Sequence, residues 1–244
     1  MKYNKICIML PTYKRSKTSL PVFINSALET CSNPANICFS FCVNKKDIDT
    51  LEYLDSYIFP FGCEYEIIVE NSFVPNLAKY FNMLYNQTRF SGSDIVASML
   101  GDDMELKTHG WDIQLLNAIS GLDGIGVFYC NDNFIAGGNL CVNLFVTRKF
   151  VDATKKPFMC PMFNADMIDY VWHMVGGLTR SLHYSENIVI QHNHDLKKTP
   201  EERDETYNRL EPFRQSVRNK FAEANVYASV CAGNLVEAGL VEWK

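Results

Sequence analysis

The sequence predicts an α/β fold in which a mostly parallel central sheet is flanked by helices, and three observations indicate it. In the first hundred residues, short apolar runs alternate with longer segments whose apolar residues recur every three or four positions. This alternation is typical of parallel strands joined by covering helices. Several of the runs end abruptly in polar residues, as strands do where they leave a buried sheet. The composition is that of a globular chain, with 47% hydrophobic and 21% charged residues.

Each element of the first half has a local signal. The apolar runs that predict strands are residues 5–10, 37–43, 65–70 and 94–100. Residues 19–31 predict the first helix, and residues 47–58 predict a second, with apolar side chains at helical spacing. A third helix is expected after Pro75, because a proline is tolerated in a first helical turn. Its apolar face consists of Leu77, Tyr80, Phe81 and Leu84.

The second half has weaker signals. It predicts a helix at 110–119, a strand at 124–130, a strand running into a helix within 137–152, a helix at 165–177 and a strand at 187–195. A charged, amphipathic helix is expected over 200–224, interrupted near Pro212. The tail 226–243 is apolar enough to pack against the body, but its pattern gives it no position.

Charge, cysteine content and hydropathy limit the function classes. The net charge of -5 disfavours broad binding to nucleic acid or anionic membranes, although a local basic patch stays possible. The nine cysteines are an odd number without CxxC spacing, which predicts reduced thiols and a cytoplasmic location. No run approaches the roughly 18 apolar residues that span a bilayer, so a soluble protein is expected.

The ends of the predicted strands carry the first candidate site. Ligands of open parallel sheets bind beyond the carboxyl ends of the strands, where this chain places the strings LPTYKR, EN and GDD. Asp102 and Asp103 fit a site for Mg²⁺ or Mn²⁺, which one or two carboxylates bind together with substrate phosphates and water. The cation would offset their mutual repulsion. The alternative is a turn with a helix-capping aspartate.

Two further strings carry titratable side chains. His192 and His194 end a predicted strand and share one face of it, so both could reach one ion; imidazole is a plausible Mn²⁺ ligand. Two ordinary surface imidazoles are the alternative. Asp166 and Asp169 lie one turn apart at the start of a predicted helix for which Asn164 is a credible cap. Stabilisation of the helix N-terminus by Asp166, and a solvated position for Asp169, are the alternatives.

Taken in order, these pieces resemble the GT-A glycosyltransferases, in particular the family-2-like group, over residues 5–195. The turn after the first strand (MLPTYKR), the helix carrying Ala78 and Asn82, the GDD string and the late histidines occur in the family's order. The resemblance implies a Rossmann-like fold in one domain, 1–244. Its nucleotide-sugar-binding half would be 1–105, its acceptor and catalytic half 106–195, and its C-terminal helical extension 196–244.

The resemblance also implies roles for individual residues. Asp103 would bind the metal, with His192 or His194 completing the metal shell, and Asp166 would be the general base. Contacts to the nucleotide sugar are implied for Pro11, Thr12, Tyr13, Arg15, Asn44, Asn71, Asn82 and Asp102. Three positions depart from the family pattern: Gly101 replaces the first acid, Ala165 replaces a glutamate, and Asn44 replaces an aspartate, whose base contact Asp47 could take over.

The implied activity is metal-dependent transfer of a sugar, with inversion, from a nucleotide sugar to an acceptor hydroxyl. The cofactor would be Mn²⁺ or Mg²⁺ and the donor most simply a UDP-sugar. The acceptor is open among a saccharide, a lipid-linked glycan, a protein and a hydroxymethylated DNA base. Two other functional hypotheses are compatible with the sequence: a nucleotidyltransferase, and a non-catalytic nucleotide-binding module. The strings GxxxxGK[ST], GxGxxG and GxSxG are absent.

Overall fold

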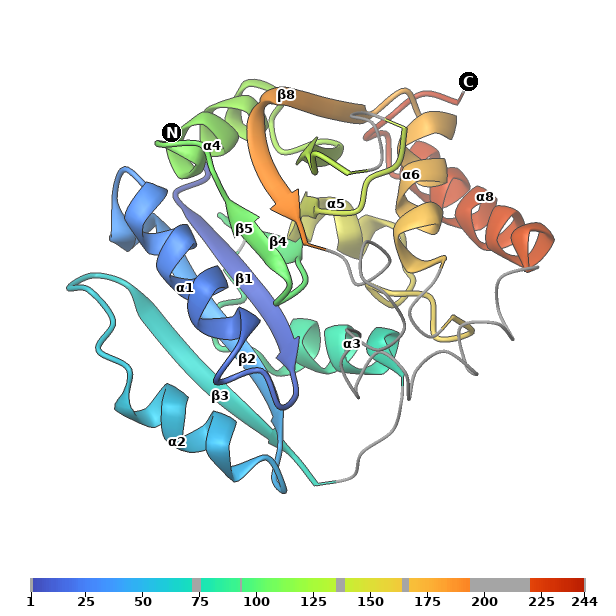
Figure 1. The fold of residues 1–244 in the computed structure, drawn as a ribbon. Helices are drawn as coiled ribbons and strands as arrows, with labels where there is room; N and C mark the ends of the chain where they lie inside the picture. The colour runs from blue at the N-terminus through green and yellow to red at the C-terminus, as the bar shows by residue number, and fades with distance from the viewer. Residues whose placement is uncertain are drawn as a thin grey trace.

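The computed structural model describes residues 2–71, 76–92, 94–134, 139–163, 167–193 and 220–243. They form one mixed sheet of eight strands with helices on both faces (Figure 1). The sheet has the order β3-β2-β1-β4-β7-β6-β8-β5. The strands are β1 (Lys5–Thr12), β2 (Ile37–Asn44), β3 (Glu64–Glu70), β4 (Ile95–Met99), β5 (Met104–Leu106), β6 (Val127–Asn131), β7 (Leu144–Thr147) and β8 (Leu182–His192). The helices are α1 (Ser19–Thr30), η1 (Pro34–Asn36), α2 (Ile48–Ser56), α3 (Leu77–Gln87), α4 (Trp111–Gly121), α5 (Arg148–Ala153), α6 (Ile168–Leu178) and α8 (Phe221–Glu237).

The first half of the chain folds as its pattern predicts. Strands β3, β2, β1 and β4 are all parallel, so their carboxyl ends lie along one edge of the sheet. Side chains alternate between the two faces along each strand. In β1, Cys7 and Met9 point to one face, whereas Ile6, Ile8 and Leu10 point to the other. All five are buried, as expected of a central strand covered on both sides.

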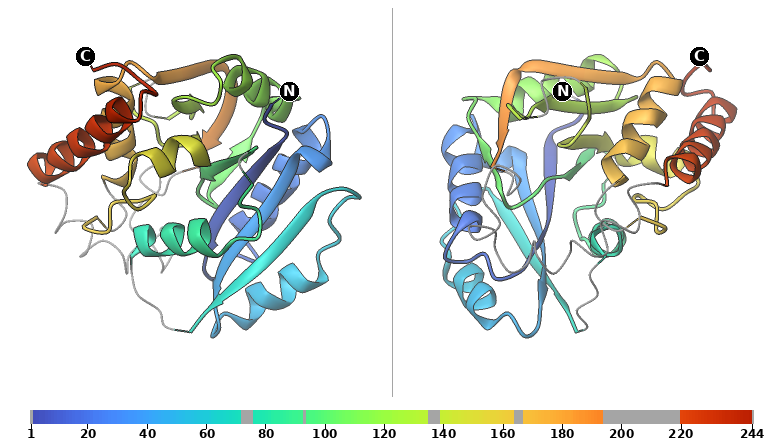
Figure 2. Two further views of the ribbon diagram at one scale, coloured as in Figure 1. Left: turned by 180° about the vertical axis from the view of Figure 1, so that it is seen from behind. Right: turned by 45° about the vertical axis from the view of Figure 1, so that its right-hand side comes forward.

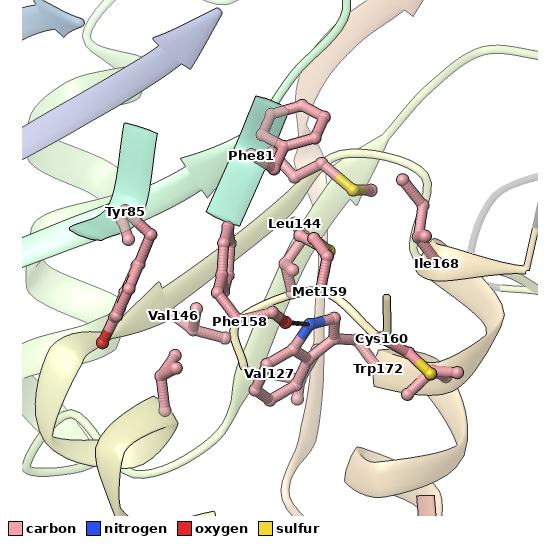
Figure 3. Packing of buried hydrophobic residues seen from close by; sticks show 14 of the residues in the cluster. Phe81, Tyr85, Val127, Leu144, Val146, Phe158, Met159, Cys160, Ile168 and Trp172 are labelled. Atoms are coloured by element: carbon pink, nitrogen blue, oxygen red, sulfur yellow. Dashed lines mark hydrogen bonds between the residues drawn. The ribbon is translucent and has the colours of Figure 1, made fainter. Parts of the chain in front are cut away.

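Two hydrophobic layers cover the sheet. One lies between the sheet and α1, α2 and α4, and the other lies between the sheet and α3, α5 and α6, with α8 packed on the outer side of α6 (Figure 2). In the second layer Phe158 lies against both Tyr85 and Trp172, and the Trp172 indole N–H donates to the carbonyl of Phe158 at 2.8 Å (Figure 3). Full burial of such side chains contributes about 1.5–3 kcal/mol each, so both layers hold the strand ends in place.

The second half departs from a parallel arrangement. Strand β7 is antiparallel to both β4 and β6, and β8 is parallel to β6. The short strand β5, which no local apolar pattern predicted, is antiparallel to β8. Strand β8 begins at Leu182, earlier than the expected residue 187, and its pairing with β6 shifts register after Cys130. A curved β8 therefore reaches the edge strand β5 with its carboxyl end (Figure 1).

The C-terminal part is only partly described. The expected helix at 200–224 lies mostly outside the described residues. Helix α8 begins at Phe221 and places much of the apolar tail against α6, where Ala224, Ala228, Cys231 and Leu235 are buried. All nine cysteines are free thiols. Among the described helices, none combines the length and the apolar character needed to cross a membrane.

Candidate functional site

The carboxyl ends of β1 and β4 bring Thr12, Arg15 and Asp102 together. The Thr12 hydroxyl donates to Oδ2 of Asp102 at 2.6 Å, and Nη1 of Arg15 lies 3.4 Å from Oδ1 of the same carboxylate. Nη1 of Arg15 also donates to the Ser19 hydroxyl in the first turn of α1, at 3.1 Å. The Arg15 and Asp102 side chains are only 13% and 12% exposed. Asp102 is thus bound from the β1 side of the edge.

Asp103 is directed toward β8. Its Oδ2 lies 3.4 Å from Nε2 of His192, and its backbone carbonyl accepts from the Asn193 N–H at 2.9 Å. The pairing of Met104 with His192, at the end of the β5–β8 ladder, fixes this approach. A carboxylate and an imidazole nitrogen at this distance are two suitable ligands for a divalent cation such as Mn²⁺.

The two adjacent acids therefore contact different neighbours, although both lie within one tight turn. The Met104 N–H donates to the Gly101 carbonyl at 3.2 Å, which closes the turn over both aspartates. A Cβ at Gly101 would lie 2.4 Å from Oδ1 of Asp103, so a larger residue would displace that carboxylate.

The end of β6 adds two residues that the sequence analysis missed. The His192 N–H donates to the Asp132 carbonyl at 2.9 Å, and the Phe134 ring lies edge-on to the imidazole, with centroids 5.9 Å apart. Asp132 is buried, and its Oδ1 accepts from the Phe134 N–H. The available signal was the string CNDNF, in which polar residues follow an apolar run, as in the other strand ends.

At the end of β2, the Asn44 and Asp47 side chains have different surroundings. Asn44 is 7% exposed; its Oδ1 accepts from the Lys46 N–H at 3.0 Å, and among the described residues its Nδ2 has no hydrogen-bond partner. Asp47 caps α2 through Thr50 and accepts from the Lys14 N–H at 2.6 Å. Because its two carboxylate oxygens accept from backbone N–H groups of Lys14 and Thr50, Asp47 connects the loop after β1 to the loop after β2.

The remaining expected contacts lie around this edge. Pro11 is the penultimate residue of β1, and Tyr13 follows the strand with Lys14 Nζ 5.5 Å from its ring centroid. Asn71 is exposed directly after β3. Asn82 lies within α3, where its Nδ2 donates to the Met159 carbonyl at 2.8 Å and its Oδ1 accepts from the Met159 N–H at 2.7 Å. The Asn82 amide thus joins α3 to the segment before α6.

Part of the expected site lies outside the described residues, namely Asn164, Asp166 and His194. Within the described ranges, no three His, Cys, Asp or Glu side chains gather into a group that could hold a metal ion. Asp103 and His192 form a pair of suitable ligands. Such a pair fits a cation whose remaining ligands are phosphate oxygens and water.

Neither a family model nor a curated protein matches the chain. Solved structures do resemble it. Mannosyltransferase PcManGT from Pyrobaculum calidifontis, in complex with GDP-Man and Mn²⁺, gives a TM-score of 0.58 at 9% identity, over 97% of this chain and 76% of its own. S. aureus TarS 1-349, in complex with UDP-GlcNAc, gives 0.59 at 10% identity, over 96% and 73%. The chain therefore has the GT-A glycosyltransferase fold.

Proposed function

We propose that the protein is a metal-dependent, inverting glycosyltransferase that moves a sugar from a nucleotide sugar to an acceptor hydroxyl. The observation that carries the proposal is that two acids lie together at one edge of the sheet. Asp102 is bound by Thr12 and Arg15, and Asp103 lies beside His192. The fold supports this assignment, because it is shared with a mannosyltransferase. Residues 1–105 would bind the nucleotide sugar, 106–195 the acceptor, and 196–244 would form an extension.

The donor is a nucleotide sugar, most simply a UDP-sugar. TarS was solved with UDP-GlcNAc and PcManGT with GDP-Man, so the fold accommodates both kinds of base. In this chain, Asp102 would accept from a ribose hydroxyl, while Pro11, Tyr13, Asn44 and Asn71 surround the same edge. Nδ2 of Asn44 is buried at the end of β2 and has no hydrogen-bond partner among the described residues, so it is a donor suited to the nucleotide.

Asp103 and His192 would hold Mn²⁺ or Mg²⁺, with His194 as a further candidate ligand. When bound, the cation would stabilise the negative charge that develops on the leaving diphosphate. Asp103 contributes a hard anionic oxygen and His192 a neutral nitrogen. The β5–β8 pairing orients both before any ligand arrives, which lowers the entropic cost of assembling the site.

Asp166 is the proposed general base. Its carboxylate would take the proton of the acceptor hydroxyl while that oxygen attacks the anomeric carbon and the bond to the nucleoside diphosphate breaks. Attack from the face opposite the leaving group inverts the configuration. A positioned base of this kind contributes typically about 10²–10⁴-fold to the rate.

The acceptor class is a saccharide, a lipid-linked glycan or a hydroxymethylated DNA base. The net charge of -5 favours the first two over DNA. A gel shift with hydroxymethylated duplex, compared with unmodified duplex, tests the third directly. A transfer assay with each acceptor class and a labelled donor identifies the product.

The proposal is tested by differential scanning fluorimetry, which measures the melting temperature of the protein with each of a panel of nucleotide sugars, in the presence and absence of Mn²⁺. A ligand at 100 times its Kd should stabilise the protein by about 2.7 kcal/mol. Asp166→Asn should keep donor binding and lose most turnover. Pyrophosphate release from a nucleoside triphosphate would favour a nucleotidyltransferase instead. If no nucleotide sugar binds or is cleaved in the presence of Mn²⁺, the proposal is wrong.

A further inference from the structure

The contacts of Arg15 distinguish it from Lys17, a second cation of the same loop. Its guanidinium lies 3.4 Å from Oδ1 of Asp102 and donates to the Ser19 hydroxyl, and its side chain is 13% exposed. Its backbone carbonyl accepts from Thr18 and Leu20 at the start of α1. By contrast, Lys17 pairs with Asp49 at the surface, with the two side chains 81% and 61% exposed. Arg15 is therefore held in place from both sides.

The same contacts determine the charge available beside Asp103. Asp102 and Asp103 are adjacent in the chain and are directed toward β1 and β8 respectively. Ion pairs with little solvent exposure are screened much less than surface pairs, so Arg15 offsets most of the charge of Asp102. A cation approaching Asp103 then meets the field of about one carboxylate instead of two.

We propose that Arg15 is a positioning residue that neutralises Asp102 and thereby keeps the affinity of the site for a divalent cation low until a nucleoside diphosphate supplies further ligands. This inference rests on the proposed function. Thr12 cooperates with Arg15, because its hydrogen bond holds the second oxygen of Asp102 on the β1 side. Cation and nucleotide consequently bind together: each raises the affinity for the other by the same factor.

The test measures Mn²⁺ binding in the absence of nucleotide, from the electron paramagnetic resonance signal of free Mn²⁺. Arg15→Gln removes one positive charge beside two acids, so the affinity for Mn²⁺ alone should rise about tenfold or more, which corresponds to about 1.4 kcal/mol. Arg15→Met, which keeps the apolar stem, should give the same rise. Arg15→Lys should remain close to the wild type.

Two controls make the result specific. Adding Asp102→Asn to Arg15→Gln should return the affinity to the wild-type level, because the released carboxylate is then absent. Lys17→Gln removes a charge of the same sign from the same loop and should leave the affinity unchanged. Circular dichroism and the melting temperature of each variant check that the protein is folded.

The outcomes separate this inference from the proposed function. If the wild type binds Mn²⁺ with UDP but Arg15→Gln and Arg15→Met leave binding of Mn²⁺ alone unchanged, the positioning role is wrong. A loss of UDP affinity without any gain for Mn²⁺ would mean that Arg15 contacts the diphosphate itself, which also overturns it. An equal rise in Lys17→Gln would show a non-specific charge effect. If no variant binds Mn²⁺ with or without UDP, the metal-dependent function fails as well.

Discussion

Asn82 offers a sharp test of how far a family pattern can be transferred to this chain. The resemblance implies a contact between Asn82 and the nucleotide sugar, whereas the structure places both ends of its amide on the backbone of Met159. Met159 is completely buried. We predict that Asn82→Ala destabilises the fold while leaving nucleotide affinity nearly unchanged.

The size of the effect follows from the two hydrogen bonds. They measure 2.8 and 2.7 Å, and their loss leaves a buried carbonyl and a buried N–H without partners. Each unsatisfied buried group costs about 1–3 kcal/mol, so the free energy of unfolding should fall by about 2–6 kcal/mol. For a chain of this size, about 3 °C per kcal/mol lowers the melting temperature by roughly 6–18 °C.

Urea unfolding followed by circular dichroism gives the change in stability, and calorimetric titration with UDP and Mn²⁺ under native conditions gives the affinity. Asn44→Ala is the comparison variant, because Asn44 is a buried asparagine whose Nδ2 has no hydrogen-bond partner among the described residues, whereas both ends of the half-buried Asn82 amide are paired. Asn44→Ala should lower nucleotide affinity with a smaller loss of stability. If Asn82→Ala keeps full stability and loses nucleotide binding, the reasoning from its contacts is refuted.

Three further predictions concern the site and its supports. Asp112 is fully buried and accepts hydrogen bonds from the Ser32 N–H, the Asn33 N–H and the Asn36 amide. Asp112→Ala should therefore lower the free energy of unfolding, measured in urea, by about 2–4 kcal/mol, and a decrease of less than about 1 kcal/mol would contradict this. Gly101→Ala should leave the melting temperature nearly unchanged but weaken Mn²⁺ binding in the presence of UDP, because its Cβ would displace the Asp103 carboxylate. Burial lowers the pKa of His173 below its usual value near 6.5. The unfolded chain therefore binds a proton on this imidazole at a higher pH than the folded protein does. The stability that the neutral imidazole contributes is complete above the usual pKa and is lost as the pH falls through that value. His173→Gln should flatten the decline of stability between about pH 7 and 5, and an unchanged slope would count against this assignment.

The sequence determined the fold of the first hundred residues. Its strands and helices follow local patterns of apolar residues, and local patterns are enough because parallel strands joined by covering helices are buried on both faces. The same patterns placed Asp102 and Asp103 at a strand end. They also predicted correctly that the ends of β1, β3 and β4 share one edge of the sheet.

Only the tertiary structure decided what the two acids contact. Strand β5 is three residues long and pairs with residues of β8 that lie more than eighty positions later in the chain. Such a short strand has no local pattern of apolar residues from which it could be predicted. That antiparallel pairing brings His192 to Asp103, while the parallel pairing of β1 with β4 brings Thr12 to Asp102. Likewise, the position of Met159 decides what the Asn82 amide binds. Backbone pairing and side-chain contacts between distant segments depend on the packing of the whole sheet. The family resemblance therefore implied that His192 or His194 joins Asp103, but the contact of His192 with Asp103 and those of Thr12 and Arg15 with Asp102 appear only in the folded chain.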